Sequence, residues 1–217
     1  MSIAKTMILF GGGGHAAVVT ESARAAGFVV LGFLSDSGHE EDETADVPEV
    51  MGLKRLGSIS DFATIMTSYR HANGHAAVGD ASLREQWLEI MSKKPMPTPA
   101  VIHPTAAVSP SARIGEGVFI GPQAVVNARA AIGRGAIINS AAIVEHDCTV
   151  GEFCHLAPRS ALAGGVSIGR GTLLGVSCTV IPKVRIGAGC TLAAGAVVIS
   201  DIPDGAMAMG LPARVAE

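Results

Sequence analysis

Every sixth residue from Ile102 to Val198 is isoleucine, leucine or valine, and this period constrains the chain more than any other feature. Neither an amphipathic helix nor a hairpin sheet keeps a six-residue period over about a hundred residues. A coil of short parallel strands does, because each hexad forms one side of a prism and neighbouring coils bury each other's aliphatic side chains. The period therefore predicts a β-solenoid with three hexads in each coil. Its 17 aliphatic positions are Ile102, Val108, Ile114, Ile120, Val126, Ile132, Ile138, Val144, Val150, Leu156, Leu162, Ile168, Leu174, Val180, Ile186, Leu192 and Val198.

A second position in the hexad, four residues after the aliphatic one, is small or β-branched. The four cysteines, Cys148, Cys154, Cys178 and Cys190, all fall at this position, and no C-x-x-C spacing occurs. A thiol there is expected to behave as a slightly larger alanine. We therefore interpret the cysteines as reduced core residues rather than as disulfide partners or zinc ligands.

Composition agrees with a narrow aliphatic core and excludes several functions. Hydrophobic residues make up 48% of the 217 residues, but aromatic residues only 4%, and the formal net charge is −3. That charge argues against nucleic acid or an anionic membrane as the main partner. The chain has no apolar run long enough to span a bilayer, and its first residues lack the regions of a signal peptide. We therefore expect a cytoplasmic protein.

The sequence predicts two domains. A small α/β domain spans residues 1–95, and the solenoid with a short tail spans residues 96–217. An apolar run at 6–10, the glycines 11–14, a helix over 16–26 and a second apolar run at 29–34 form a β–loop–α–β unit. The acidic segment 38–49 is expected to be a solvated loop. Further on, we expect a helix over 60–69, a buried strand within 76–80 that ends in a loop, and a helix over 82–93 with a capping box formed by Ser82 and Glu85.

Four consecutive glycines followed by His15 exceed what a strand–helix turn needs. Such a loop lets backbone N–H groups and a helix N-terminus approach a phosphate closely, so we favour anion binding there. Gly11, Gly13 and Ala16, followed by Asp36, also resemble a dinucleotide fingerprint. The domain is too short for the full six-stranded fold, which argues against NAD.

The densest polar departure within the hexads is Glu145-His146-Asp147-Cys148, with Asn139 before it and His155 after it. His146 lies two residues after the core residue Val144, on the outward part of its repeat. An imidazole there can act as a base near neutral pH, and Asp147 can fix its tautomer if the backbone turns between them. The alternative is a solvated surface histidine beside an acid. No histidine spacing suits a three-histidine metal site, so we expect no metal.

These motifs in combination resemble the left-handed β-helix acyltransferases. With the front domain, about 200 residues resemble the branch of sialic-acid O-acetyltransferases and nucleotide-aminosugar N-acetyltransferases, which includes the bacillosamine-pathway and perosamine enzymes. The resemblance rests on the loop 11–15, Ile137-Ile138-Asn139-Ser140, the stretches 144–148 and 151–155, and Gly210-Leu211-Pro212-Ala213.

The resemblance implies a Rossmann-like α/β domain, a left-handed parallel β-helix and a homotrimer with active sites between subunits. It further implies acetyl-CoA as co-substrate and a UDP- or GDP-linked 4-amino-dideoxy sugar as acceptor. His146 matches the catalytic base and Asp147 its acidic partner. The matching acceptor-binding residues are Gly13, Gly14, His15, Asp36, Gly79, Asp80, Arg84 and Asn139, and those for acetyl-CoA are His155, Gly164, Val176 and Ala194. Two departures, Ser35 where some relatives have an acid and Asp80 where many have asparagine, leave the nucleotide base open.

Two other functions stay open at this point. One is O-acetylation of a hydroxyl on a sialic-acid-like nonulosonate, since the front domain occurs in both branches. The other is a non-catalytic trimeric scaffold that binds sugar nucleotides, against which the His146–Asp147 pair speaks.

Overall fold

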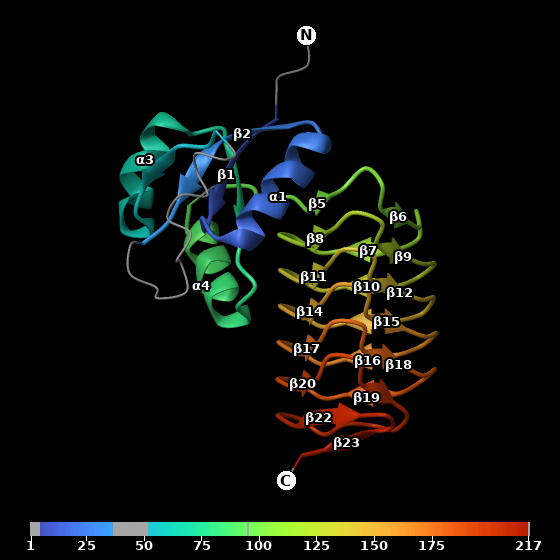
Figure 1. Ribbon diagram of the computed structural model, residues 1–217. Coiled ribbons are helices and arrows are strands. Elements are labelled where there is room, and N and C mark those ends of the chain that lie inside the picture. Colours follow the sequence, from blue (N-terminus) through green and yellow to red (C-terminus); the bar gives the residue numbers. More distant parts are fainter. Residues whose placement is uncertain (1–4, 37–51, 95, 217) are drawn as a thin grey trace. The chain divides into compact units, whose positions relative to one another are not determined.

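The computed structural model describes residues 5–36, 52–94 and 96–216, and the chain divides into two compact units, residues 1–101 and 102–217 (Figure 1). The division falls six residues after the boundary expected at 95. The reason is that the proline-rich segment 96–99 packs on the first unit: Met96 is buried, and the backbone N–H of Gly74 donates to the carbonyl of Pro97 at 2.9 Å. The two units are described separately below.

In its described part, the first unit is a parallel sheet in the order β3-β2-β1-β4 with helices between the strands. Residues Met7 to Phe10 of β1 are fully buried, as a central parallel strand covered on both faces requires. The strands are β1 (Lys5–Phe10), β2 (Phe28–Leu34), β3 (Arg55–Gly57) and β4 (Asn73–Ala76), and the helices are α1 (Gly14–Ala25), the 3₁₀ turn η1 (Ile59–Asp61), α3 (Phe62–Ser68) and α4 (Ala81–Ser92).

The α/β prediction is confirmed, with corrections in the second half of the unit. The strand expected within 76–80 lies at Asn73–Ala76, because β4 pairs only with Met7–Phe10 and leaves the sheet where β1 ends. The capping box was wrong: the N-cap of α4 is Asp80, whose carboxylate accepts a hydrogen bond from the N–H of Leu83 at 2.8 Å. The short strand β3 was not predicted, and the acidic segment 38–49 lies outside the described residues.

The second unit is a three-sided prism of stacked two-residue strands, as the hexads predict (Figure 1). The pairings between two-residue strands join residues 18 apart, for example Ile143 with Ala161. At the C-terminal end the spacing shortens to 16, as in Thr191 with Met207. We call the three sheets the first, second and third faces in chain order. The first face holds β5 (Val101–Ile102), β8 (Phe119–Ile120), β11 (Ile137–Ile138), β14 (His155–Leu156), β17 (Leu173–Leu174) and β20 (Thr191–Leu192), and continues into β22 (Met207–Gly210) and β23 (Ala213–Val215). The second face holds β6 (Ala107–Val108), β9 (Val125–Val126), β12 (Ile143–Val144), β15 (Ala161–Leu162), β18 (Thr179–Val180) and β21 (Val197–Val198). The third face holds β7 (Arg113–Ile114), β10 (Ala131–Ile132), β13 (Thr149–Val150), β16 (Ser167–Ile168) and β19 (Arg185–Ile186).

The aliphatic hexad positions form the core of the prism. All of them from Ile120 to Val198 are buried, whereas Ile102, Val108 and Ile114 are partly exposed. These three lie in β5, β6 and β7, the end strands of the three faces, so no earlier coil covers them.

The corners of the prism are made by residues in the left-handed backbone region, spaced by multiples of six. Several of these residues are not glycine, and they include Arg129 (φ 60°) and Asp147 (φ 62°). Non-glycine residues adopt this conformation at some cost, so the repeating hydrogen bonds of the coils must hold it. The chain direction changes at each such residue, which aligns corner side chains on successive coils.

The cysteine prediction is confirmed. All four thiols are free and buried, and the Sγ atoms of Cys148 and Cys154 donate to the carbonyls of Ala163 and Gly169 at 3.2 and 3.0 Å. Burial raises the pKa of Cys178 to about 11, so this thiol stays protonated at neutral pH. Among the described residues, no helix is both long enough and apolar enough to cross a membrane.

Neighbouring leucines of β17 test the packing account. Leu174 is fully buried and Leu173 is 37% exposed. We expect Leu174→Ala to lower the free energy of unfolding by about 2–5 kcal/mol, because it leaves a cavity between coils. The matched Leu173→Ala variant should lose about 1 kcal/mol or less. Chemical denaturation at one protein concentration measures both, and equal losses would contradict the assignment of core and surface.

Candidate functional site

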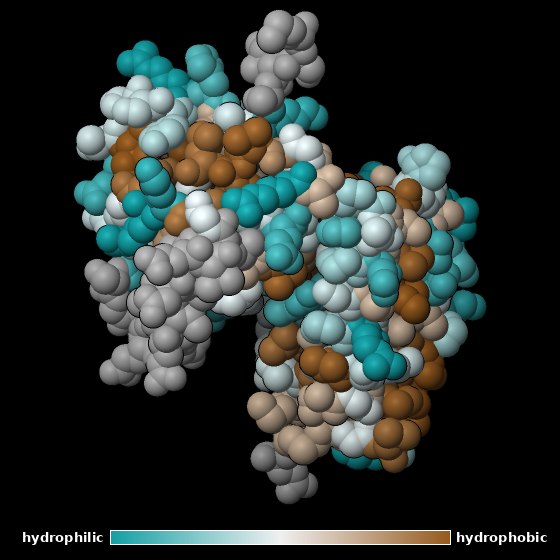
Figure 2. Space-filling model, turned by 45° about the horizontal axis from the view of Figure 1, so that its top comes forward, coloured by the Kyte–Doolittle hydropathy of each residue, from teal (hydrophilic) through white to brown (hydrophobic). Residues whose placement is uncertain are grey.

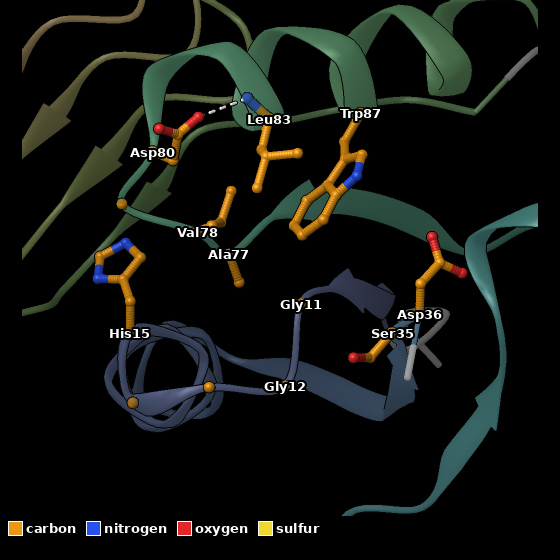
Figure 3. Close-up of a pocket in the computed structure, with 13 residues that line it drawn as sticks. Gly11, Gly12, His15, Ser35, Asp36, Ala77, Val78, Asp80, Leu83 and Trp87 are labelled. Atoms are coloured by element: carbon orange, nitrogen blue, oxygen red, sulfur yellow. Dashed lines mark hydrogen bonds between the residues drawn. The ribbon is translucent and has the colours of Figure 1, made fainter. Parts of the chain in front are cut away.

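The first unit contains a cavity of about 490 Å³ at the carboxyl ends of its strands (Figure 3). The loops after β1, β2 and β4 form it. Since β2 and β4 flank β1 on opposite sides, the loops that follow these strands diverge and leave a crevice, as parallel α/β sheets do where their strand order reverses. The lining residues are Gly11, Gly12, Gly13, Gly14, His15, Ser35, Asp36, Ala77, Val78, Gly79, Asp80, Leu83 and Trp87.

The glycine loop has one part that needs glycine for packing and one part that stays open. A Cβ on Gly11, whose φ is +111°, would lie 2.7 Å from the carbonyl oxygen of Ala77, and one on Gly12 would meet the ring of Phe33. A Cβ on Gly14 would meet nothing within 4 Å. Helix α1 begins there, and its N-cap Gly13 supplies no side-chain hydrogen bond. The N-terminus of α1 therefore presents backbone N–H groups and a positive dipole end to the cavity, which suits a phosphate.

The end of β2 brings two polar residues to the cavity, and contacts with the next segment hold them. The Arg55 guanidinium donates to the carbonyl of Ser35 from Nε at 3.0 Å and from Nη2 at 2.6 Å. Oδ1 of Asp36 accepts from the backbone N–H of Ile59 at 2.8 Å. Figure 3 shows Ser35 and Asp36 at the end of the cavity that also contains Trp87. Asp36 is exposed, and a fixed carboxylate of this kind can accept hydrogen bonds from a bound base.

Arg84 lies behind the cavity wall rather than in it, which corrects its expected direct role. It is 1% exposed, and its Nη1 donates to the carbonyls of Val78, Gly79 and Asp80 at 3.0, 2.7 and 3.2 Å. Arg84 therefore holds the second loop in shape. Burial, reinforced by the charge of Arg84, lowers the pKa of His75 to about 4, so His75 is neutral near pH 7.

Sequence reasoning missed the apolar wall of the cavity. Leu83 and Trp87, four residues apart on one face of α4, both line it. The Trp87 ring also belongs to the core, since it is 8% exposed and packs against Phe10, with ring centroids 6.5 Å apart. Flat apolar surface beside a few fixed polar groups is typical of a site for a small ligand.

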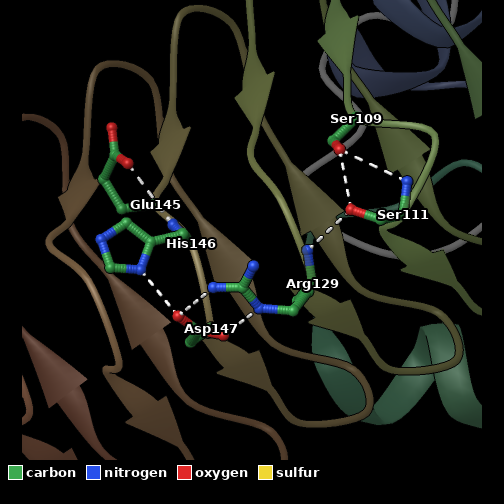
Figure 4. A network of polar contacts seen from close by, with 6 residues as sticks. All are labelled: Ser109, Ser111, Arg129, Glu145, His146 and Asp147. Atoms are coloured by element: carbon green, nitrogen blue, oxygen red, sulfur yellow. Dashed lines mark hydrogen bonds and ion pairs between the residues drawn. The ribbon is translucent and has the colours of Figure 1, made fainter.

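In the solenoid, His146 and Asp147 lie at the corner between the second and third faces, which we call the second corner. The left-handed backbone at Asp147 turns the two side chains together, and His146 Nδ1 lies 2.8 Å from Asp147 Oδ2 (Figure 4). Because a carboxylate only accepts, Nδ1 carries the proton. In the neutral imidazole, Nε2 is then free to accept a proton.

Gly164 lies on the next coil, 18 residues after His146, and its lack of a side chain makes room for the imidazole. A Cβ built on Gly164 would lie 2.7 Å from both Cε1 and Nε2 of His146. The N–H of Gly165 also donates to the carbonyl of His146 at 2.9 Å, which fixes the backbone of His146. The next coil thus sets the position of the His146 ring at the second corner.

A second group of predicted residues lies at the corner between the first and second faces, which we call the first corner. Asn139 follows β11 there, and Val176 and Ala194 follow β17 and β20. His155 lies on the adjoining first face, and its Nε2 accepts from the Asn139 amide at 3.2 Å. The amide orientation agrees with the second contact of Asn139, whose Oδ1 accepts from the N–H of Ser140 at 2.8 Å.

The predicted solenoid residues thus divide between two corners of the prism. His146, Asp147 and Gly164 share the second corner, whereas Asn139, Val176 and Ala194 share the first. The position of a residue within the 18-residue coil determines the corner at which it lies, so the two groups stay apart on every coil. One solenoid therefore does not bring the whole set together.

Comparisons with known proteins agree with both units. The PglD N-terminal domain family matches residues 6–91, and the bacterial transferase hexapeptide family, six repeats, matches residues 165–200. PerB from Caulobacter crescentus, solved with CoA and GDP-perosamine, is 40% identical, with 99% of each chain covered and a TM-score of 0.90. The acetyltransferase domain of PglB from Neisseria gonorrhoeae, solved with acetyl coenzyme A, is 32% identical over 99% of this chain and 100% of that one, with a TM-score of 0.86.

At this identity over nearly the whole length, the chain belongs to the family of hexapeptide-repeat sugar N-acetyltransferases that carry a PglD N-terminal domain. The expected left-handed parallel β-helix is thereby confirmed. WeeI from Acinetobacter baumannii, 22% identical over 98% of this chain and 100% of that one, with a TM-score of 0.81, shares the fold.

The close approach of Gly164 to His146 gives a test of the base's placement. We expect Gly164→Ala to push the imidazole aside and to lower kcat by up to about 10²-fold, while thermal melting changes little. Turnover and melting curves measure the two effects. In the double variant with His146→Asn, Gly164→Ala should cost nothing further, because it acts through the ring. Losses that multiply in the double variant would contradict this role.

Proposed function

We propose that the protein is an acetyl-CoA-dependent N-acetyltransferase that acetylates the amino group of a UDP- or GDP-linked 4-amino-dideoxy sugar. The observation that carries the proposal is the His146–Asp147 pair on a hexapeptide solenoid, with Nδ1 and Oδ2 2.8 Å apart. The same chain also has a cavity at the carboxyl ends of the strands of its first unit. The 40% identity with PerB, which was solved with CoA and GDP-perosamine, supports the same reaction class.

The cavity of the first unit is the proposed site for the nucleotide part of the acceptor. The N-terminus of α1, from Gly13 to His15, suits the diphosphate, and Trp87 and Asp36 suit the base. Gly79 and Asp80 form the second loop, which Arg84 holds in shape. Two convergent loops and one helix N-terminus can thus hold an anionic ligand without a metal ion.

The proposed chemistry is direct transfer. The amine is mostly protonated near pH 7, so it must first release one proton to solvent to free the lone pair that attacks the thioester carbonyl. Nε2 of His146 accepts the second proton from the nitrogen as the new C–N bond forms, and backbone N–H groups stabilise the oxyanion. The C–S bond then breaks, CoA leaves as a thiolate, and the proton from His146 can neutralise it. Asp147 stabilises the imidazolium between these two steps.

Residues of the first corner are proposed to bind acetyl-CoA and to line the acceptor pocket. Val176 is 47% exposed, and Ala194, one coil further on, is also exposed, so an extended pantetheine arm can run along this column of turns. Asn139 lies at the same corner on an earlier coil and shares a hydrogen bond with His155 on the adjoining first face.

We further propose a homotrimer in which the first corner of one chain meets the second corner of another. The division of the site residues between two corners supports this arrangement. So does the apolar surface of the solenoid, visible as brown patches on this unit in Figure 2. Exposed apolar patches mark interaction sites in soluble proteins. The large exposed apolar residues of the solenoid are Ile143, Leu173, Val176, Ile181, Ile199, Met207, Met209, Leu211 and Val215. We place the trimer in the cytoplasm.

A panel of acceptors tests the reaction. Thiol release from acetyl-CoA is followed with UDP- and GDP-linked 4-amino sugars, their 4-hydroxy counterparts and a free nonulosonate. We expect release only with an amino sugar, and mass spectrometry of the product should show an added acetyl group on nitrogen. Release with a hydroxyl acceptor alone would indicate an O-acetyltransferase. Binding of nucleotide-sugars without any release would indicate a scaffold.

The role of His146 gives a quantitative prediction. His146→Asn removes the base but keeps a polar side chain, so kcat should fall by about 10²–10⁴-fold. Steady-state kinetics measures the loss, and calorimetric titration with the nucleotide-sugar should show unchanged affinity. Activity equal to that of the parent protein would rule out His146 as the base.

A further inference from the structure

Arg129 makes the strongest contact with the Asp147 carboxylate. Its Nε and Nη2 donate to Oδ1 and Oδ2 of Asp147 at 2.7 and 2.8 Å, and Oδ2 also accepts from His146 (Figure 4). A bidentate guanidinium–carboxylate pair fixes the orientation of both groups. Residue Arg129 is absent from the roles assigned above, yet it touches the partner of the proposed base.

The solenoid itself brings Arg129 to this place. Arg129 precedes Asp147 by 18 residues, one full coil, and both residues adopt the left-handed backbone conformation at the second corner. The backbone N–H of Arg129 donates to Ser111 Oγ, one coil earlier, at 3.1 Å. Ser111 in turn contacts Ser109. The arginine is therefore held at its backbone as well as at its guanidinium.

The other charged groups near the imidazole come from the same corner. Glu145 precedes His146 and accepts weakly from its N–H at 3.4 Å. On the coil after Asp147 stands Gly165, which has no side chain, and Lys183 follows one coil further. The Cys148 thiol is buried, and burial raises its pKa, so it contributes no charge. Arg129 is thus the cation in direct contact with the Asp147 carboxylate.

A carboxylate beside an imidazole favours the protonated ring, and a protonated ring cannot act as a base. A cation on the same carboxylate opposes this effect, because it offsets the charge that the imidazole senses. Hydrogen bonds from Arg129, and then from His146, hold the pKa of Asp147 far below its usual range, so the carboxylate stays ionised and keeps both partners.

We propose that Arg129 is a positioning residue of the acetyl transfer: it aims the Asp147 carboxylate at the imidazole and limits how strongly that carboxylate favours the protonated ring. This inference rests on the proposed role of His146 as the base. Its two parts separate experimentally. Orientation of the Asp147 carboxylate depends on the two N–H groups of the guanidinium, whereas offsetting the carboxylate's charge needs only a cation.

Three variants of the full-length protein test it. Arg129→Met removes the cation and the paired N–H groups but keeps an unbranched apolar stem, whereas Arg129→Lys keeps the cation alone. Arg170→Met is the matched control: Arg170 donates to Glu152, 18 residues before it, at 2.6 Å and is likewise partly exposed, but this pair lies outside the second corner. Each variant is followed by the pH dependence of kcat/KM with one acceptor and by the proton NMR titration of the His146 ring.

In Arg129→Met, the acidic limb of the pH–rate profile and the midpoint of the His146 titration should both move to higher pH, because the carboxylate then favours the protonated ring without an opposing cation. The plateau of kcat should also fall by about tenfold, because the carboxylate is no longer aimed. Arg129→Lys should restore the midpoint but not the full plateau. Arg170→Met should leave both unchanged.

An unmoved or lowered midpoint in Arg129→Met, or an equal shift in Arg170→Met, would overturn the inference. The NMR titration needs no turnover, so it still reports the coupling if the protein transfers no acetyl group. Failure of the proposed function and failure of the Arg129 role therefore give different results.

Discussion

The stacking of each residue on the one 18 positions later is the constraint on which the solenoid and its chemistry depend. The constraint originates in the core, where aliphatic side chains of successive coils bury each other. Once the core has fixed the coils, the corners repeat with the same period. Arg129 must then lie against Asp147, and Gly164 under His146, without any specific loop to bring them together. The geometry around His146 is thus a consequence of core packing.

The first unit reaches a binding site by a different physical route. There the order of four parallel strands leaves a crevice, and the loops after β1, β2 and β4 fill its edges. Gly11 lets the loop after β1 approach the loop after β4, Gly12 leaves room for the ring of Phe33, and three loop carbonyls accept hydrogen bonds from the buried Arg84. One unit therefore offers a rigid wall for chemistry, and the other a cavity shaped for an anionic ligand.

Much of this arrangement could be predicted from the sequence, because a strict period transmits local patterns to three dimensions. The hexads predicted the core and the burial of the cysteines, and the phase of His146 predicted its outward position. Arg129 could have been found by stepping back 18 residues from Asp147. The position of Arg84 behind the loop could not, because its partners are backbone carbonyls whose directions depend on the loop conformation. Likewise, nothing in Ala76-Ala77-Val78 marks where β4 leaves the sheet, since that point is fixed by the end of β1.

The central claim is that the catalytic site is completed by the first corner of one chain and the second corner of another. The most direct measurement is the activity of mixed trimers made by co-expressing His146→Asn with Asn139→Ala chains. Each variant alone should be nearly inactive, whereas an equal mixture should recover about a quarter of parent activity, because one interface in four then pairs two intact corners. A mixture no more active than the mean of the two single variants would show that each chain completes its own site, and would contradict the account.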